Sequence, residues 1–141
     1  MAANDPSGEA LADWGKLVLR GSLGVLILLH GIAKMIAGPA SVTGLVANAG
    51  LPPALGYLVY VGEVVAPMLL IIGLWTRPAA IVVAINMLTA ILLVHIGDIF
   101  SLNKGGGWAI ELQGMFLIAA ASVALLGAGR LSVGGRYGRW N

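Results

Sequence analysis

Five side chains that can move protons or hydrogen-bond to a ligand interrupt long apolar stretches of this sequence. They are His30, Lys34, Glu63, His95 and Glu111. His30 and Lys34 stand four residues apart, which places them on one face of a helix, one turn from each other. Ionisable groups are costly in hydrocarbon, and proteins usually place them there with partners. We therefore expect these five residues to form one shared polar site.

The chemistry of this set fits a proton relay or a site for a quinone head group. His30 and Lys34 can donate hydrogen bonds to quinone carbonyls, and Glu63 can accept or deliver the accompanying protons. Quinone is therefore the cofactor that we expect, with His30, Lys34 and Glu63 binding it. All five residues are candidates for the catalytic role.

Haem and metal ions are the other cofactors that the residues leave open. A His/Glu set can bind a metal, but the Glu-x-x-His pattern of di-iron bundles is absent after both Glu63 and Glu111. His30 and His95 could ligate a b-type haem, although the carboxylates and the lysine crowd that arrangement. A buried ion-pair network with a purely structural role is the remaining alternative.

The composition is that of an integral membrane protein. Of 141 residues, 59% are hydrophobic and 10% are charged, whereas about a quarter of the residues in a soluble domain are charged. The absence of cysteine excludes disulfides, iron–sulfur ligation by thiolates and c-type haem attachment. Four apolar runs predict an all-α, polytopic bundle in one domain, with transmembrane helices at roughly 17–37, 54–75, 79–99 and 108–127.

The segments that flank the first helix are polar or rich in small residues. In the short polar N-terminal segment, Asp5-Pro6 can cap and begin a short helix. A cleaved signal peptide is an alternative for the first apolar run, but a run of this length that ends in His30 and Lys34 favours a retained helix. Residues 38–53 are expected to form a loop.

Several residues inside the helices predict local structure. Pro67 cannot donate to the Glu63 carbonyl four residues earlier, so we expect a kink in the second helix. Asn86 is expected to make an interhelical hydrogen bond outside the polar layer, because it lies about 180° around the helix from His95. Gly21, Gly24 and Gly31 are interpreted as packing glycines that let helices approach.

The distribution of basic residues predicts the orientation. Six of the eight lysines and arginines flank the N-terminus, the turn between the second and third helices, and the C-terminus: Lys16, Arg20, Arg77, Arg130, Arg136 and Arg139. Only Lys34 and Lys104 fall on the other side, so both termini should be cytoplasmic.

With this orientation the polar candidates all fall in the outer half of the bilayer. Lys34 then lies opposite Glu63 and Glu111 as a counter-ion. Asp98 belongs to the same layer but is interpreted as a solvated helix end. Arg20 alone is left in the inner half, where we expect it to snorkel towards the surface.

The motifs of this chain, taken in order, resemble the DoxX family of small four-helix membrane proteins. The resemblance runs from about Leu17 to Gly134. It rests on LLHGIAK in the first helix, LPP before the second, GEVVAPMLLIIGLWTRPAA across the following turn, LLVHIGD, GWAIEL and GAGRLSVGG. It singles out the same five residues, His30, Lys34, Glu63, His95 and Glu111.

The resemblance implies a membrane subunit of a redox system, since the name-giving members are tied to thiosulfate:quinone oxidoreductase. We therefore expect a quinone-linked subunit in a bacterial or archaeal cytoplasmic membrane, with the lipid bilayer and redox subunits as partners and no nucleic acid. A non-catalytic anchor or assembly partner for a redox or metal-handling complex is the alternative, and a small permease is less favoured. Homo-oligomerisation, the electron donor and enzymatic activity stay open.

Overall fold

The computed structural model describes residues 6–135, 137–138 and 140–141, and all regular structure in these residues is helical. The elements are α1 (Pro6–Ala37), α2 (Ala40–Asn48), the 3-10 turn η1 (Pro53–Tyr57), α3 (Leu58–Tyr60), the π turn η2 (Val61–Val65), α4 (Ala66–Ile72), α5 (Thr76–Val94), the 3-10 turn η3 (Ile96–Asp98) and α6 (Glu111–Leu126). The predicted all-α class is confirmed.

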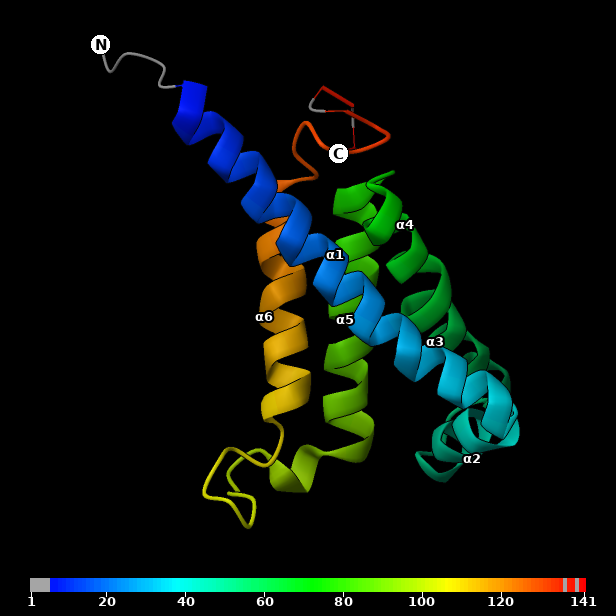
Figure 1. Cartoon of the computed structure of the whole chain (residues 1–141). Helices are drawn as coiled ribbons and strands as arrows, with labels where there is room; N and C mark the ends of the chain where they lie inside the picture. Colours follow the sequence, from blue (N-terminus) through cyan, green and yellow to red (C-terminus); the bar gives the residue numbers. More distant parts are fainter. Residues whose placement is uncertain (1–5, 136, 139) are drawn as a thin grey trace.

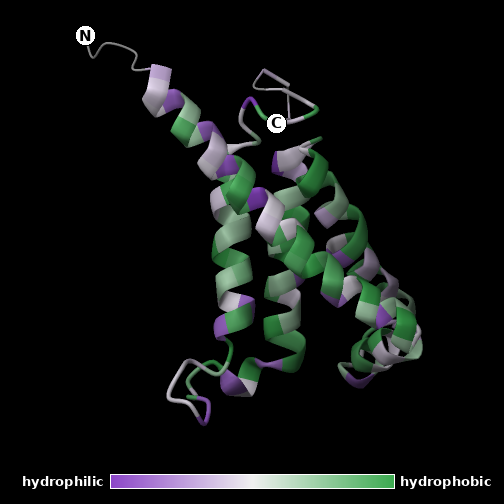
Figure 2. Cartoon of the chain, viewed as in Figure 1, coloured by the Kyte–Doolittle hydropathy of each residue, from purple (hydrophilic) through white to green (hydrophobic). Residues whose placement is uncertain are grey.

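Three stretches are long and apolar enough to cross a membrane: α1, the composite Pro53–Ile72 helix, and α5. The helix α6 is also apolar but has only 16 residues. Figure 2 shows hydrophobic residues over most of the helical surface, with polar residues gathered at the start of α1 and in the loop between α5 and α6. This pattern of three to four apolar helices is consistent with a membrane bundle.

The helices pack through small residues. Ala66, Ala79, Ala80 and Ala120 are buried in the core together with larger residues such as Leu70, and small side chains let membrane helices approach closely. In Figure 1, α1 runs diagonally across the bundle of α4, α5 and α6. The described N-terminal and C-terminal segments lie at one end, whereas α2 and the α5–α6 loop lie at the other.

The predicted start of the first helix is wrong, whereas its predicted end at residue 37 is confirmed. The first helix begins at Pro6 rather than near residue 17, because the short N-terminal helix continues into the apolar run without a break. Asp13 ties these extra turns to the C-terminal segment, since its side chain is buried and its Oδ2 accepts a hydrogen bond from Arg130 Nε at 2.6 Å. The predicted capping residue, Asp5, lies outside the described residues.

The expected loop at residues 38–53 contains the helix α2, so this prediction is also wrong. Val42 and Val46, one turn apart, are buried in the fold. Gly56 of η1 lies so close to α2 that a Cβ there would be 2.9 Å from the Thr43 backbone. The small residues from which a loop was predicted therefore form a helix, because one face of that helix packs against η1.

The later helices are shorter than predicted. The third helix ends at Val94 instead of residue 99, since His95 has φ −117° and is followed by the η3 turn. The fourth begins at Glu111 rather than 108, and Trp108 belongs to the preceding loop, where its indole N–H donates to the Ile99 carbonyl at 2.6 Å. A tight turn joins the second and third helices as predicted, but it lies at residues 73–75, with Gly73 and Trp75 at positive φ, rather than at residues 75–78, because α5 already begins at Thr76.

Arg20 does not snorkel, which corrects the prediction for this residue. Its side chain is 1% exposed. The guanidinium donates to the carbonyls of Leu70 (2.6 Å), Ile71 (2.7 Å) and Ala128 (3.3 Å), and also to that of Leu131. It therefore joins α1 to the α4–α5 turn and to the segment after α6.

The C-terminal tail folds back over the same turn. The Val133 N–H donates to the Ile72 carbonyl at 3.1 Å and the Gly134 N–H to the Gly73 carbonyl at 2.9 Å. Asn141 accepts from both the backbone and the hydroxyl of Thr76. Two arginines of the predicted basic tail, Arg136 and Arg139, lie outside the described residues.

Candidate functional site

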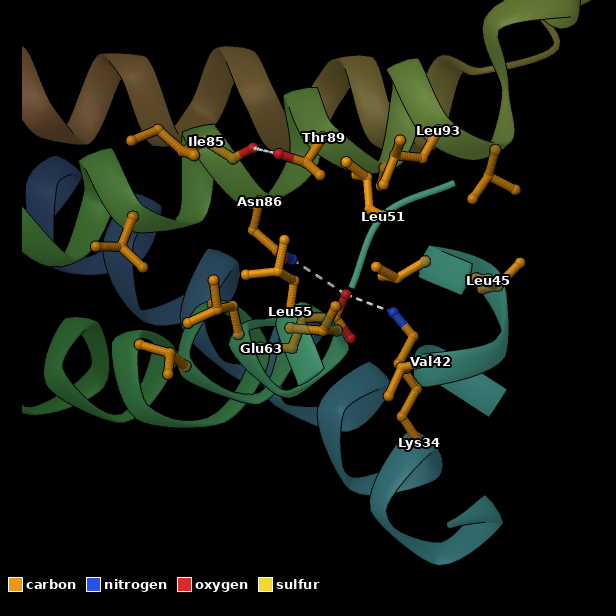
Figure 3. Close-up of a pocket in the computed structure, with 18 residues that line it drawn as sticks. Lys34, Val42, Leu45, Leu51, Leu55, Glu63, Ile85, Asn86, Thr89 and Leu93 are labelled. Atoms are coloured by element: carbon orange, nitrogen blue, oxygen red, sulfur yellow. Dashed lines mark hydrogen bonds and ion pairs between the residues drawn. The ribbon is translucent and has the colours of Figure 1, made fainter. Parts of the chain in front are cut away.

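A cavity of about 450 Å³ lies between α1, α2, α5 and the composite second helix. Such a volume is within the range of small-molecule sites, which are mostly apolar with a few placed polar groups. Its walls are aliphatic, and four polar residues interrupt them (Figure 3): Lys34, Glu63, Asn86 and Thr89. None of the described residues that line the cavity is aromatic.

Three of these polar residues form one hydrogen-bonded group. Glu63 Oε1 accepts from Lys34 Nζ at 2.5 Å and from Asn86 Nδ2 at 3.2 Å. The bonds join α1, η2 and α5 at the wall of the cavity, as Figure 3 shows. The Glu63 side chain is only 3% exposed, whereas that of Lys34 is 37% exposed. A buried carboxylate is therefore paired with a cation that reaches the surface.

The second carboxylate oxygen of Glu63 has no comparable partner. Glu63 Oε2 is buried and makes no hydrogen bond to any described residue. Leaving a buried acceptor unpaired costs about 1–3 kcal/mol, and more when the group is charged. Structures retain such groups where they store strain or serve chemistry, so this atom marks Glu63 as the centre of the site.

The backbone around Glu63 is also irregular. The π turn η2 carries Glu63, and Pro67 follows it in the first turn of α4. Insertions of this kind inside helices occur frequently at functional sites. A π turn thus lies next to Pro67, where the sequence predicted a kink in the second helix. It aims the Glu63 side chain at Lys34 and Asn86.

Glycines let the neighbouring helices reach this turn. A Cβ on Gly31 would overlap the carbonyl oxygen of Glu63, and one on Gly62 would lie 2.6 Å from the Asn86 side chain. A Cβ on Gly24 would lie 2.9 Å from the Pro67 carbonyl oxygen, so Gly24 and Gly31 are packing glycines as predicted. The same prediction for Gly21 is wrong, because nothing lies within 4 Å of a Cβ there.

His30 lies outside the cavity. Its ring is exposed, and Nδ1 lies 2.8 Å from the Leu26 carbonyl oxygen of its own helix. The ring packs edge-on against Phe116 of α6, with 5.8 Å between the centroids. One helical turn separates His30 from Lys34, but the structure gives the two residues different partners.

His95 and Glu111 lie near the junction of α5 and α6, also away from the cavity lining. His95 Nδ1 is 3.3 Å from Asp98 Oδ2, and its Nε2 is 3.0 Å from Gln113 Nε2. Both ring nitrogens therefore have partners within the protein. Glu111 is exposed in the first turn of α6. No group of three or more His, Cys, Asp or Glu suited to a metal occurs among the described residues.

The structure therefore brings together two of the five predicted residues, Lys34 and Glu63, and adds Asn86. Asn86 makes the predicted interhelical bond, but it does so within the polar site rather than outside it. The sequence signal for the role of Asn86 in the site was the presence of an asparagine inside a long apolar run. Its angular distance from His95 misled the prediction, because His95 itself does not face the cavity.

Comparisons with known proteins assign the chain to a family. The DoxX family model matches residues 15–96. An uncharacterized protein of Haemophilus influenzae is 32% identical over 123 residues, covering 84% of this chain and 87% of that protein. The Bacillus subtilis protein named "Putative oxidoreductase CatD" is 26% identical over 114 residues, covering 81% and 80%. No solved structure matches. This chain belongs to the DoxX family.

Proposed function

We propose that this DoxX protein is a membrane subunit of a quinone-linked redox system and that its cavity binds the quinone. The buried Glu63 carboxylate at the cavity wall, paired with Lys34 and Asn86, carries this proposal. The aliphatic walls suit the apolar part of a quinone, and the polar group suits its head. The name of the Bacillus subtilis relative supports a redox role.

Each polar residue has a distinct task in this proposal. The Lys34 ammonium group donates to Glu63 in the ligand-free structure, and its flexible side chain lets it donate to a quinone carbonyl instead. Asn86 holds Glu63 in place. Glu63 exchanges the protons that accompany electron transfer, while a partner subunit exchanges the electrons. His30, His95 and Glu111 do not line the cavity and are given no contact with the quinone.

For the orientation we propose that both termini are cytoplasmic, in a bacterial or archaeal cytoplasmic membrane. The count of six basic residues against two supports it. So does the position of the described N-terminal and C-terminal segments at one end of the bundle (Figure 1). The cavity then lies in the outer half of the bilayer, with α2 at the outer surface.

The proposal is tested by equilibrium binding of a radiolabelled short-chain ubiquinone to the protein purified in mild detergent. We expect saturable binding that weakens by about ten- to a hundred-fold in Glu63→Gln and Lys34→Met, since a hydrogen bond to a charged group contributes about 1.5–3 kcal/mol. Glu111→Gln is the matched control, because it makes the same change at an exposed glutamate, and its affinity should stay within about two-fold.

A structural anchor is the second candidate function. The Lys34–Glu63–Asn86 group ties three helices together, which a purely structural network would also do. In that case the wild-type protein binds no quinone, and Glu63→Gln lowers its resistance to unfolding in detergent. Absence of saturable binding by the wild-type protein would contradict the quinone proposal.

A further inference from the structure

We infer that Glu63 is a proton-loading site controlled by the position of the Lys34 ammonium group. When Lys34 turns from Glu63 towards a ligand in the cavity, Glu63 takes up one proton, and when Lys34 returns, the proton leaves. The inference deepens the proposed function, because the ligand that draws Lys34 away is the quinone of that proposal. The proton site itself can be tested without any quinone.

Among the described residues, Lys34 is the only cation that forms an ion pair with Glu63. Among the residues that line the cavity, only Lys34 and Glu63 carry ionisable groups. Asn86 and Thr89 of α5 are neutral, and α2 contributes only aliphatic side chains to the lining. Tyr60 of α3 directs its hydroxyl to the Lys34 carbonyl, at 3.4 Å, and not to Glu63. Without the ammonium group, the carboxylate keeps only the amide of Asn86.

The two partners differ in their freedom to move. Glu63 is 3% exposed and stands on the π turn, which is packed against Gly31 and followed by Pro67. Lys34 has a long, flexible side chain that is 37% exposed near the end of α1. Lysine can therefore swing between Glu63 and a nearby acceptor, while the glutamate stays in its buried position.

Loss of the cation makes protonation favourable. A buried carboxylate without a counter-ion carries a large desolvation penalty, and it is relieved by binding a proton. In the proposed step Lys34 keeps its charge and donates an N–H to a ligand carbonyl oxygen. One proton from water forms an O–H bond on the Glu63 carboxylate, and no electrons move. The site thereby holds a proton next to the ligand.

Infrared difference spectroscopy of the purified protein tests the inference at neutral pH. In Lys34→Met we expect a carbonyl-stretching band of a protonated carboxyl group, of intensity equal to one group per chain, that shifts to lower frequency in D₂O. The ligand-free wild-type protein and Lys34→Arg should lack this band, and so should Lys34→Met/Glu63→Gln. Lys104→Met, at an exposed loop lysine, is the matched control and should also lack it.

Proton uptake by the wild-type protein gives a second readout if Lys34→Met does not fold. Adding short-chain ubiquinone in weak buffer with a pH indicator should consume about one proton per quinone bound, and Glu63→Gln, at a quinone concentration that gives the same occupancy, should consume none. Folded Lys34→Met without the band, or quinone binding without proton uptake, overturns the inference while leaving the quinone proposal intact. The band in Lys34→Met together with no quinone binding supports the proton site and overturns the proposed function.

Discussion

Replacing Arg20 with methionine is expected to lower the free energy of unfolding by about 3–5 kcal/mol, because several backbone carbonyls lose the buried guanidinium as their donor, at about 1–3 kcal/mol each. The guanidinium donates to four backbone carbonyls from two distant parts of the chain. Methionine can fill much of the volume but cannot donate, so these carbonyls lose a charged partner. The Leu70 carbonyl keeps the Gly73 N–H as a donor, so the cost of about 1–3 kcal/mol for each unpaired buried acceptor applies to the other three carbonyls.

The loss should also separate parts of the fold that Arg20 holds together. Leu70 and Ile71 end the second apolar helix, while Ala128 and Leu131 belong to the segment that folds back after α6. Without the guanidinium, the C-terminal segment should detach before the helices unfold. Limited proteolysis in detergent should therefore cleave Arg20→Met within this segment under conditions in which the wild-type protein is resistant.

Two further variants make the Arg20 prediction specific. Arg20→Lys should recover little of the loss of stability. A lysine ammonium group is a single point with three donors, whereas the planar arginine fork can donate to four carbonyls. Lys104→Met removes a cation from an exposed loop and should change the denaturation midpoint little. Unfolding by a denaturing detergent, followed by circular dichroism, measures all three; a wild-type midpoint for Arg20→Met contradicts the prediction.

Arg20 also shows why part of the fold could not be predicted from the sequence. A cation near a helix end is usually solvated by snorkelling, and this was the prediction. Its actual partners are backbone carbonyls 50 to 111 residues away along the chain. Backbone carbonyls leave no pattern in a sequence, because every residue carries one. The burial therefore depends on how the tail folds, which hydropathy does not encode.

The Lys34–Glu63 pair was predictable because it leaves a chemical signature. A glutamate well inside an apolar run requires a partner, and the basic-residue count placed Lys34 at the same depth. The pairing of Lys34 with Glu63 is confirmed, whereas Glu111 is not its partner. His30 was grouped with Lys34 because the two residues are four apart on one helix, but its ring packs on Phe116 instead of facing the cavity.

Gly31→Ala is expected to destabilise the protein by about 2–3 kcal/mol and to weaken quinone binding at least ten-fold. A methyl group at this position would overlap the Glu63 carbonyl oxygen and lie 2.7 Å from its carbon and 2.8 Å from Val64 Cγ2. The obstacle is backbone rather than a flexible side chain, so α1 and η2 must move apart. Overpacking of this kind typically costs about 1–3 kcal/mol.

The effect on binding follows from the position of Gly31 between the two members of the ion pair. Lys34 lies three residues further along α1, and Glu63 is the residue whose carbonyl Gly31 contacts. Any separation of α1 from η2 therefore moves the Lys34 ammonium group, now 2.5 Å from Glu63, away from the polar end of the cavity, where it would donate to the quinone. A variant that changes no charged group should thus weaken binding as Lys34→Met does.

Gly21→Ala is the matched control, since it makes the same substitution in the same helix. A Cβ at Gly21 meets nothing within 4 Å, and alanine is favoured over glycine in a helix by about 0.5–1 kcal/mol. Gly21→Ala should therefore unfold at or above the wild-type midpoint and bind quinone with wild-type affinity. Equal effects of the two substitutions would contradict the prediction, because they would show that close contact between α1 and the Glu63 backbone does not hold the site together.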